Sequence, residues 1–291
     1  MRFFVIYFST HPMSTSQSIP NIQALVQACN ELHISYSFYD SNHNFVGLNV
    51  KKPSYFANAS TPLNDESVSK ICKDKEFTFK LVGTIVRMPK TLGFVNPLCD
   101  PQYQKYVQYD SYAAIASKIE KEFTYPLIIK MNSGSRGANI YKCHNKQDVL
   151  KALAIIYNKQ SFQYDYIALA QEYISIAREF RVIIFNKKVV LVYEKDFSKA
   201  QFVGNISPFH QENARALHIT DSVLVTKLQN FIDPLFSRLD VMFAGLDIVL
   251  DKDGDCCMIE LNSKPGFEYF VRDNGYSALV DVYKKIISYL K

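Results

Sequence analysis

The sequence predicts a mixed α/β protein in which a short Rossmann-like lobe comes first and antiparallel hairpins follow. Residues 3–8 form a continuous apolar run, the pattern of a strand that is buried on both faces of a parallel sheet. Later in the chain, apolar runs come in pairs that short turn sequences separate. Asp253-Gly254 is the clearest of these turns, and this arrangement is typical of antiparallel hairpins.

Composition restricts the class of protein. The chain has 291 residues, of which 48% are apolar and 21% charged, as in soluble globular proteins with two or three lobes. The net charge is a mild +5, and the sequence contains no run of Lys and Arg residues. Both observations argue against a nucleic-acid partner. No targeting peptide or membrane-length run is evident, so we expect a cytoplasmic protein without a membrane partner; a homo-oligomer is compatible with the sequence. The six cysteines form no CxxC pair and indicate packing.

Residues 1–63 are predicted to form the Rossmann-like lobe. A helix over about 20–32 and a strand over 34–39 complete a β-α-β unit with the first strand. The unit has no GxGxxG, which argues against a dinucleotide site. We expect residues 41–63, rich in Asn, Pro and Ser, to be a connection with at most one short strand.

Residues 64–100 are predicted to be a helical linker. Asn64 can cap a helix, and Asp65 and Glu66 complement the helix dipole in its first turn. Lys75 falls on this helix or just after it. Residues 88–94 form an extended entry into the next lobe.

Residues 101–174 are predicted to be a lid subdomain. A strand over 125–131 carries Lys130, the loop Asn132-Ser-Gly-Ser-Arg-Gly137 follows, and a second strand begins near residue 139. The backbone N–H groups of such a loop can bind an anion, although the sequence is not a Walker loop. A lysine inside an apolar strand needs a partner. A helix over 145–157 and a strand over 166–174 complete this unit.

Residues 175–291 are predicted to be the C-terminal lobe. Asn186-Lys187 turns the chain between strands over 178–185 and 188–193, and Glu179 and Arg181 share one face of that ribbon. A polar loop over 197–215 follows, then a helix over 221–239 that Asp233-Pro234 can kink. A helix over 276–290 ends the chain.

The hairpin near the C-terminus brings three oxygen-bearing side chains together. If Asp253-Gly254 is a two-residue turn, Lys252 faces Asp255 and Asp247 lies opposite Glu260. Asn262 follows on the same face, because side chains alternate along a strand. Facing carboxylates repel each other, and a hard cation such as Mg²⁺ resolves the repulsion. A calcium loop is rejected, since Cys256 and Asn262 occupy the positions that need Gly and Glu.

From about residue 64 to residue 291, these elements and motifs resemble the ATP-grasp superfamily, within it the RimK-type and glutathione-synthetase-like carboxylate–amine ligases. The most specific motifs are Phe243-Ala-Gly-Leu-Asp247 and Glu260-Leu-Asn-Ser-Lys-Pro-Gly266. The resemblance implies an ATP-grasp fold with ATP and two Mg²⁺ ions as cofactors, Mn²⁺ being an alternative. The implied metal ligands are Asp247, Glu260 and Asn262.

The resemblance also implies roles for other side chains. Lys75 and Lys130 correspond to the two nucleotide lysines, Glu179 to a ribose ligand, and Arg181 to the arginine that faces the reacting groups. Lys195 lies near a further basic position. The glycine-rich loop over the phosphates corresponds to Ser133, Gly134, Ser135 and Gly137, and the segment that contacts adenine to Gln171, Glu172, Tyr173 and Ile174.

One stretch departs from the pattern of these ligases. Asn205 is kept, but Val203 replaces an arginine, and Pro208 and Phe209 stand where small residues are common. That arginine binds the acyl phosphate or the substrate carboxylate, so the departure concerns the substrate. Lys264 can supply the missing charge, and Arg181, Lys264 and Asn205 are the predicted catalytic residues.

The implied reaction is ATP-dependent amide formation between a carboxylate and an amine through an acyl phosphate. The short N-terminal lobe suits an amino acid, a peptide or a protein acceptor. One alternative is an ATP-grasp macrocyclase that acts on a precursor peptide. The other is a non-catalytic ATP-binding regulator, which Val203 favours and the intact lysines and carboxylates oppose.

Overall fold

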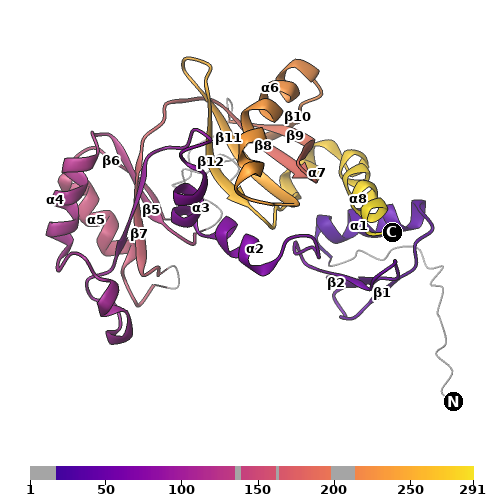
Figure 1. The fold of residues 1–291 in the computed structure, drawn as a ribbon, viewed down its shortest axis with the longest axis horizontal. Helices are drawn as coiled ribbons and strands as arrows, with labels where there is room; N and C mark the ends of the chain where they lie inside the picture. The colour runs from indigo at the N-terminus through magenta and orange to yellow at the C-terminus, as the bar shows by residue number, and fades with distance from the viewer. Residues whose placement is uncertain (1–17, 135–138, 162–163, 198–213) are drawn as a thin grey trace.

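The computed structural model describes residues 18–134, 139–161, 164–197 and 214–291. They form three lobes in a row (Figure 1), an N-terminal lobe beside a central five-stranded sheet and a middle lobe on the other side of that sheet. All sheet pairings among the described strands are antiparallel. In the described part of the chain, no helix has the length and apolar character needed to cross a bilayer.

The described part of the N-terminal lobe holds three strands, which form an antiparallel sheet in the order β1-β2-β3. The strand over residues 3–8, which would complete the β-α-β unit, lies outside the described residues, so that unit stays a prediction. The connection over 41–63 holds two strands where at most one was predicted. Asp40 closes the turn before the first of them by accepting from Phe45 N at 2.8 Å, and the side chains of the second, Ser54–Ala57, are alternately buried and exposed. The elements are α1 (Pro20–Glu31), β1 (Tyr36–Phe38), β2 (Phe45–Leu48) and β3 (Ser54–Ala57).

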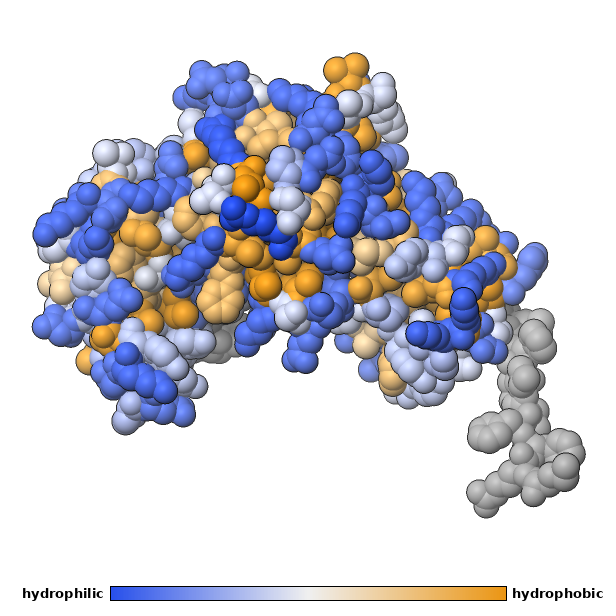
Figure 2. All heavy atoms as spheres, in the orientation of Figure 1, coloured by the Kyte–Doolittle hydropathy of each residue, from blue (hydrophilic) through white to orange (hydrophobic). Residues whose placement is uncertain are grey.

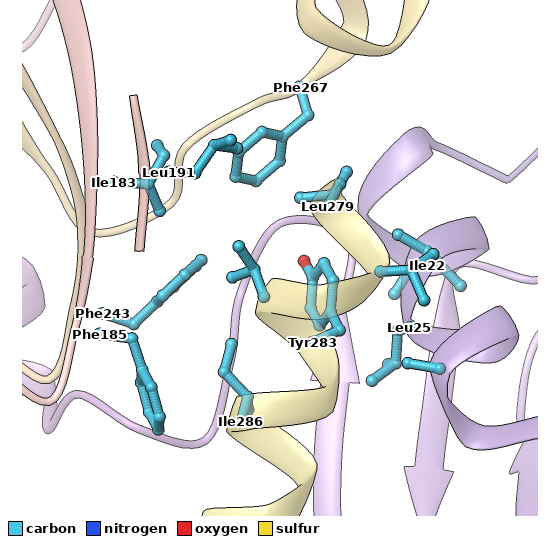
Figure 3. Packing of buried hydrophobic residues seen from close by; sticks show 14 of the residues in the cluster. Ile22, Leu25, Ile183, Phe185, Leu191, Phe243, Phe267, Leu279, Tyr283 and Ile286 are labelled. Atoms are coloured by element: carbon cyan, nitrogen blue, oxygen red, sulfur yellow. The ribbon is translucent and has the colours of Figure 1, made fainter. Parts of the chain in front are cut away.

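The terminal helix α8 (Ser277–Leu290) joins the N-terminal lobe to the central sheet. Its apolar face lies between α1 and the sheet, and Figure 3 shows Tyr283 and Ile286 pointing between Phe243 on one side and Ile22 on the other. These side chains are almost completely buried. Burial of a large apolar side chain contributes about 1.5–3 kcal/mol, so the C-terminal helix is a main part of this core.

The linker consists of α2 (Glu66–Lys73) and α3 (Lys75–Val82). Asn64 does not cap α2. Asp65 does, accepting from Val68 N at 2.7 Å, while Asn64 bonds to Phe243 O at 2.6 Å and Met242 N at 2.8 Å. A cap must sit directly before the first helical turn, and Asn64 is one residue too early.

The middle lobe is a four-stranded sheet in the order β4-β7-β5-β6, which α4 and α5 cover. Asn145 caps α5 as predicted. Helix α4 was not predicted. Strand β4 lies within the residues predicted to be a helical linker, and its place at one edge of this sheet was not predicted either. The elements are β4 (Thr91–Val95), η1 (Pro101–Tyr106), α4 (Tyr112–Glu122), β5 (Leu127–Met131), β6 (Ile140–Cys143), α5 (Lys146–Ile156) and β7 (Ile167–Glu172).

The C-terminal lobe is built on the sheet β10-β9-β8-β11-β12. α6 and η3 pack on one face together with α2 and α3, and α7 and α8 pack on the other. The turn at Asn186 and Lys187 and the break at Pro234 are as predicted; β10 and α7 were not predicted. The elements are β8 (Ile176–Phe185), β9 (Lys188–Asp196), β10 (Arg215–His218), α6 (Ser222–Ile232), η3 (Asp233–Ser237), β11 (Phe243–Asp251), β12 (Cys256–Asn262) and α7 (Glu268–Asn274).

Candidate functional site

The candidate site lies where the central sheet, α3 and the middle lobe meet. Figure 2 shows polar side chains over most of one face of the molecule, with apolar side chains gathered near the centre of the view. On β8, Phe180, Val182 and Ile184 face the core under α6. Because side chains alternate, Glu179 and Arg181 lie together on the opposite face, as predicted.

The hairpin β11–β12 places Asp247 directly opposite Glu260, as predicted, but its loop and register differ from the predicted ones. Asp251 bonds to Asp255, so the loop has three residues and only Gly254 has positive φ, 83°. A β-bulge next to Asp247 then shifts the register by one residue. The two-residue turn was wrong, and the bulge compensates for the longer loop.

Asp251, at the tip of this hairpin, is buried rather than solvated. Its carboxylate lies 2.7 Å from Arg87 and accepts from Asp255 N at 2.9 Å. These bonds, led by the one from Arg87, lower the pKa of Asp251. The hairpin tip is therefore fixed to the linker.

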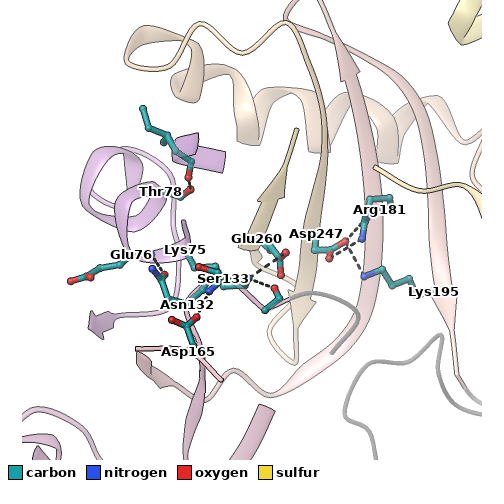
Figure 4. A network of polar contacts seen from close by, with 12 residues as sticks. Lys75, Glu76, Thr78, Asn132, Ser133, Asp165, Arg181, Lys195, Asp247 and Glu260 are labelled. Atoms are coloured by element: carbon teal, nitrogen blue, oxygen red, sulfur yellow. Dashed lines mark hydrogen bonds and ion pairs between the residues drawn. The ribbon is translucent and has the colours of Figure 1, made fainter. Parts of the chain in front are cut away.

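Asp247 is the centre of a buried ionic network (Figure 4). Arg181 binds both of its oxygens, at 2.6 and 3.2 Å, and Lys195 lies 2.9 Å from Oδ1. Lys195 also contacts Glu179 at 2.5 Å. Burial alone would raise the pKa of Asp247, but the two cations lower it. The strands thus bring together four of the predicted site residues, and their charges balance.

A second group of contacts joins α3 to the hairpin and to the middle lobe. Lys75, the first residue of α3, donates to Gly134 O at 2.6 Å and to Asn132 O at 3.3 Å. Its Nζ lies 3.7 Å from Glu260 Oε1. Lys75 therefore connects the start of the glycine-rich loop to one of the predicted metal ligands.

Lys130 lies on β5 and is 3% exposed. Among the described residues, no carboxylate lies within ion-pair distance of it. Burial lowers its pKa to about 8, and the positive charge of Lys75 adds to this effect, while Glu260 and Asp247 act in the opposite direction. Two neighbouring ammonium groups, one of them buried, favour the binding of an anion between them.

The lowered pKa predicts a pH dependence. Between about pH 8 and 10.5 the folded state loses the Lys130 proton while the unfolded chain retains it. The unfolded state then binds more protons, so the free energy of unfolding rises with pH, by at most about 1.4 kcal/mol per unit. We expect wild type to show this gain relative to Lys130→Met in urea unfolding between pH 7 and 10.5. Parallel curves for the two proteins would contradict it.

Two further side chains, those of Asn132 and Asp165, hold the start of the loop. Asn132 was predicted only as a residue of the loop, and Asp165 was not identified from the sequence. Asp165 Oδ2 accepts from Ser133 N at 2.8 Å, and Asn132 Oδ1 accepts from Glu76 N at 3.1 Å. Both side chains are buried. The sequence feature that could have identified them is their position, since each is a polar residue next to an apolar strand.

The segment predicted to contact adenine, residues 171–174, begins with the last two residues of β7, and the side chains of these two are already bonded within the middle lobe. Gln171 donates to Thr91 Oγ1 at 2.8 Å, and Glu172 accepts from Lys90 N at 3.2 Å. The ring of Tyr173 lies 3.9 Å from Lys142 Nζ. Contact of Glu172 with an adenine amine would compete with its bond to Lys90.

The remaining predicted site residues differ in burial and in their position relative to the ionic network. Asn262 is half-buried and pairs with Gly245, on the same face as Asp247 and Glu260. Lys264 is exposed between β12 and α7. Gly245 has a packing reason to lack a side chain, because a Cβ there would lie 2.9 Å from Pro265 Cβ. The residues outside the described part of the chain are Ser135, Gly137, Val203, Asn205, Pro208 and Phe209.

The donor set fits a hard cation. Asp247, Glu260 and Asn262 offer two carboxylates and an amide oxygen on one face of two adjacent strands, the ligand types that Mg²⁺ takes. No cluster of three or more His, Cys, Asp or Glu residues that could hold a metal occurs within the described ranges. The set therefore relies on the asparagine and on further oxygens from a ligand. Metal binding by Asp247 would also require some of its bonds to Arg181 and Lys195 to break.

Comparison with known proteins gives consistent matches. A family model described as a RimK-like ATP-grasp domain matches residues 100–290. A D-alanine--D-alanine ligase of Acetivibrio thermocellus is 26% identical over 173 residues, which are 55% of this chain and 42% of that protein. The chain spans less than half the length of the curated relatives it matches.

Solved structures show the same fold at low identity. The VanG D-Ala:D-Ser ligase of Enterococcus faecalis has a TM-score of 0.55 and 19% identity, over 78% of this chain and 62% of that one. The ATP-grasp ligase PsnB, complexed with a minimal precursor, Mg and ADP, has a TM-score of 0.50 and 16% identity, over 77% and 62%. These likenesses establish the architecture.

Proposed function

The chain belongs to the RimK-like ATP-grasp family, and from this premise we propose that it joins a carboxylate to an amine, converting ATP to ADP and phosphate. One observation carries the proposal. Lys75 and Lys130 lie beside the facing pair Asp247 and Glu260, where the middle lobe meets the central sheet. Two cations beside two carboxylates suit a metal-bound triphosphate.

Each group has a separate task in this proposal. Lys75, Lys130 and the glycine-rich loop neutralise and hold the phosphates. Asp247, Glu260 and Asn262 would hold Mg²⁺, as two ions or with Mn²⁺ in its place, which neutralises phosphate charge when bound. In the same proposal Glu179 would bind the ribose hydroxyls, and the 171–174 segment would contact the base.

The reaction needs positioning and charge stabilisation rather than a protein nucleophile. A carboxylate oxygen of the substrate attacks the γ-phosphorus, the bond to the bridging oxygen breaks, and ADP leaves. The amine then attacks the acyl carbon, phosphate leaves, and the amine loses a proton. Arg181 and Lys195 stabilise negative charge near Asp247, because both are cations held beside it.

Lys264 is proposed to bind the substrate. It is exposed, two residues beyond Asn262. Lys264→Ala should raise the substrate KM about tenfold and leave the KM for ATP unchanged, since one charge-assisted hydrogen bond is worth about 1.5–3 kcal/mol. Steady-state kinetics with each substrate varied in turn measures both constants. Lys291→Ala, at the far end of α8, is the control, and an unchanged substrate KM in Lys264→Ala would remove this role.

The substrate class is proposed to be an amino acid or a peptide. D-alanine ligases and a ligase in complex with a minimal precursor both occur among the similar proteins, which supports an amino-acid or peptide carboxylate. The second candidate is a macrocyclase that links side chains within a precursor peptide; the likeness to PsnB, a ligase complexed with a minimal precursor, supports only that the substrate is a precursor. The third candidate, a regulator that binds ATP without turnover, is opposed by the complete set of lysines and carboxylates.

An ADP-release screen with pooled amino acids and dipeptides tests the proposal. Substrate-dependent ADP formation, with an amide product of matching mass, is the expected result. ATP binding without turnover of any pool would favour the regulator. Product that has lost one water from a single peptide, with no added mass, would favour the macrocyclase.

A further inference from the structure

Two buried side chains hold the start of the glycine-rich loop, and the family resemblance assigns neither of them a role. Asn132 and Asp165 are 2% and 5% exposed. Asn132 is the first residue after β5, and Asp165 lies two residues before β7. Figure 4 shows both of them below Lys75, beside Ser133.

Asp165 ties the loop to the middle sheet. Its Oδ2 accepts from Ser133 N at 2.8 Å, and its Oδ1 accepts from Ile167 N, at the start of β7, at 3.0 Å. Bonds from N–H groups to an ionised carboxylate are about twice as strong as neutral ones. The carboxylate therefore sets the spacing between the loop and β7.

Asn132 ties the same loop to α3. Its Oδ1 accepts from Glu76 N at 3.1 Å, and its backbone N donates to Ile167 O at 3.2 Å. The carbonyls of Asn132 and Gly134 both accept from Lys75 Nζ. Glu260 is a further neighbour at 3.7 Å, an ion-pair distance, so two carbonyls and one carboxylate surround the ammonium.

We propose that Asn132 and Asp165 are positioning residues that fix the phosphate-binding half of the nucleotide site. This inference rests on the proposed function and deepens it. The two side chains determine where the loop starts and where the Lys75 ammonium points. Their loss should weaken the binding of the triphosphate and leave the binding of the base and ribose unchanged.

The test compares ATP with AMP, each displacing a fluorescent ATP analogue from wild type, Asn132→Ala and Asp165→Asn. In both variants ATP affinity should fall at least about tenfold, while AMP affinity should stay within about twofold, because the change concerns the phosphate side. A merely structural role would weaken both nucleotides together. Asn96→Ala is the matched control, since Asn96 is equally buried in the same lobe and, among the described residues, its side chain accepts a hydrogen bond only from Leu98 N.

The outcomes separate this inference from the proposed function. A wild type that does not bind ATP overturns both. Wild-type binding with unchanged ATP affinity in the two variants overturns the inference alone. If a variant fails to fold, amide hydrogen exchange of wild type decides: slow exchange at Ser133 and Glu76 supports the two bonds, and fast exchange at both overturns the inference.

Discussion

Replacing Glu260 with Gln is expected to reduce substrate-dependent ADP release about 10²- to 10³-fold, a loss typical when one charged group that stabilises the transition state is removed. Glutamine keeps the shape of the side chain but removes the negative charge that would hold the metal opposite Asp247. Stability should change by less than about 1 kcal/mol, because the contact with Lys75 is long, 3.7 Å, and partly exposed. Coupled ADP assays and urea unfolding measure the two effects.

Glu120→Gln is the matched control for this variant. Glu120 lies on α4 and pairs with Lys146 at 3.0 Å, in the middle lobe but away from the hairpin. It should keep wild-type activity. Full activity of Glu260→Gln would remove the carboxylate pair from the site and with it the main support for the proposed reaction.

Asp247→Asn is expected to destabilise the protein by about 3–5 kcal/mol, the usual cost of breaking a buried ion pair by removing one partner. Lys195 would keep its ion pair with Glu179, whereas Arg181 would lose the carboxylate to which it donates two hydrogen bonds. The pKa of Asp247 is lowered in the folded state, so its stabilisation is present above the ordinary carboxyl pKa and is lost as pH falls through the lowered value. Urea unfolding at pH 7 and at pH 3 checks both parts.

The control is Asp240→Asn, which removes a carboxylate that is 76% exposed and pairs with Lys187 at 3.2 Å. An exposed pair contributes about 0–1 kcal/mol, so little change is expected. If Asp247→Asn were as stable as Asp240→Asn at pH 7, the buried network would not stabilise the fold. Weak bonds between Arg181 and Asp247 would then compete little with Mg²⁺ for the oxygens of Asp247.

Strand alternation predicted two pairs of side chains at the candidate site. Asp247 and Glu260 share one face, and so do Glu179 and Arg181, as predicted, because the alternation of side chains along a strand is a local property of the sequence. The pairing of β11 with β8, which brings the two pairs together, was not predicted. The turn at Asn186-Lys187 followed from residues that tolerate positive φ. The antiparallel N-terminal sheet was not foreseen, because short strands with one solvated face look like loops.

The sequence by itself determined which side chains share a face on each strand of the central hairpin, because side chains alternate with a period of two. The pairing of Asp247 with Glu260 also depended on the bulge, which offsets a loop one residue longer than predicted. Only the tertiary structure decided what those side chains contact. Arg181 meets Asp247 across 66 residues of chain, and Lys75 meets Gly134 across 59. Such contacts depend on how whole lobes pack, and no local pattern encodes the partner of a buried charge.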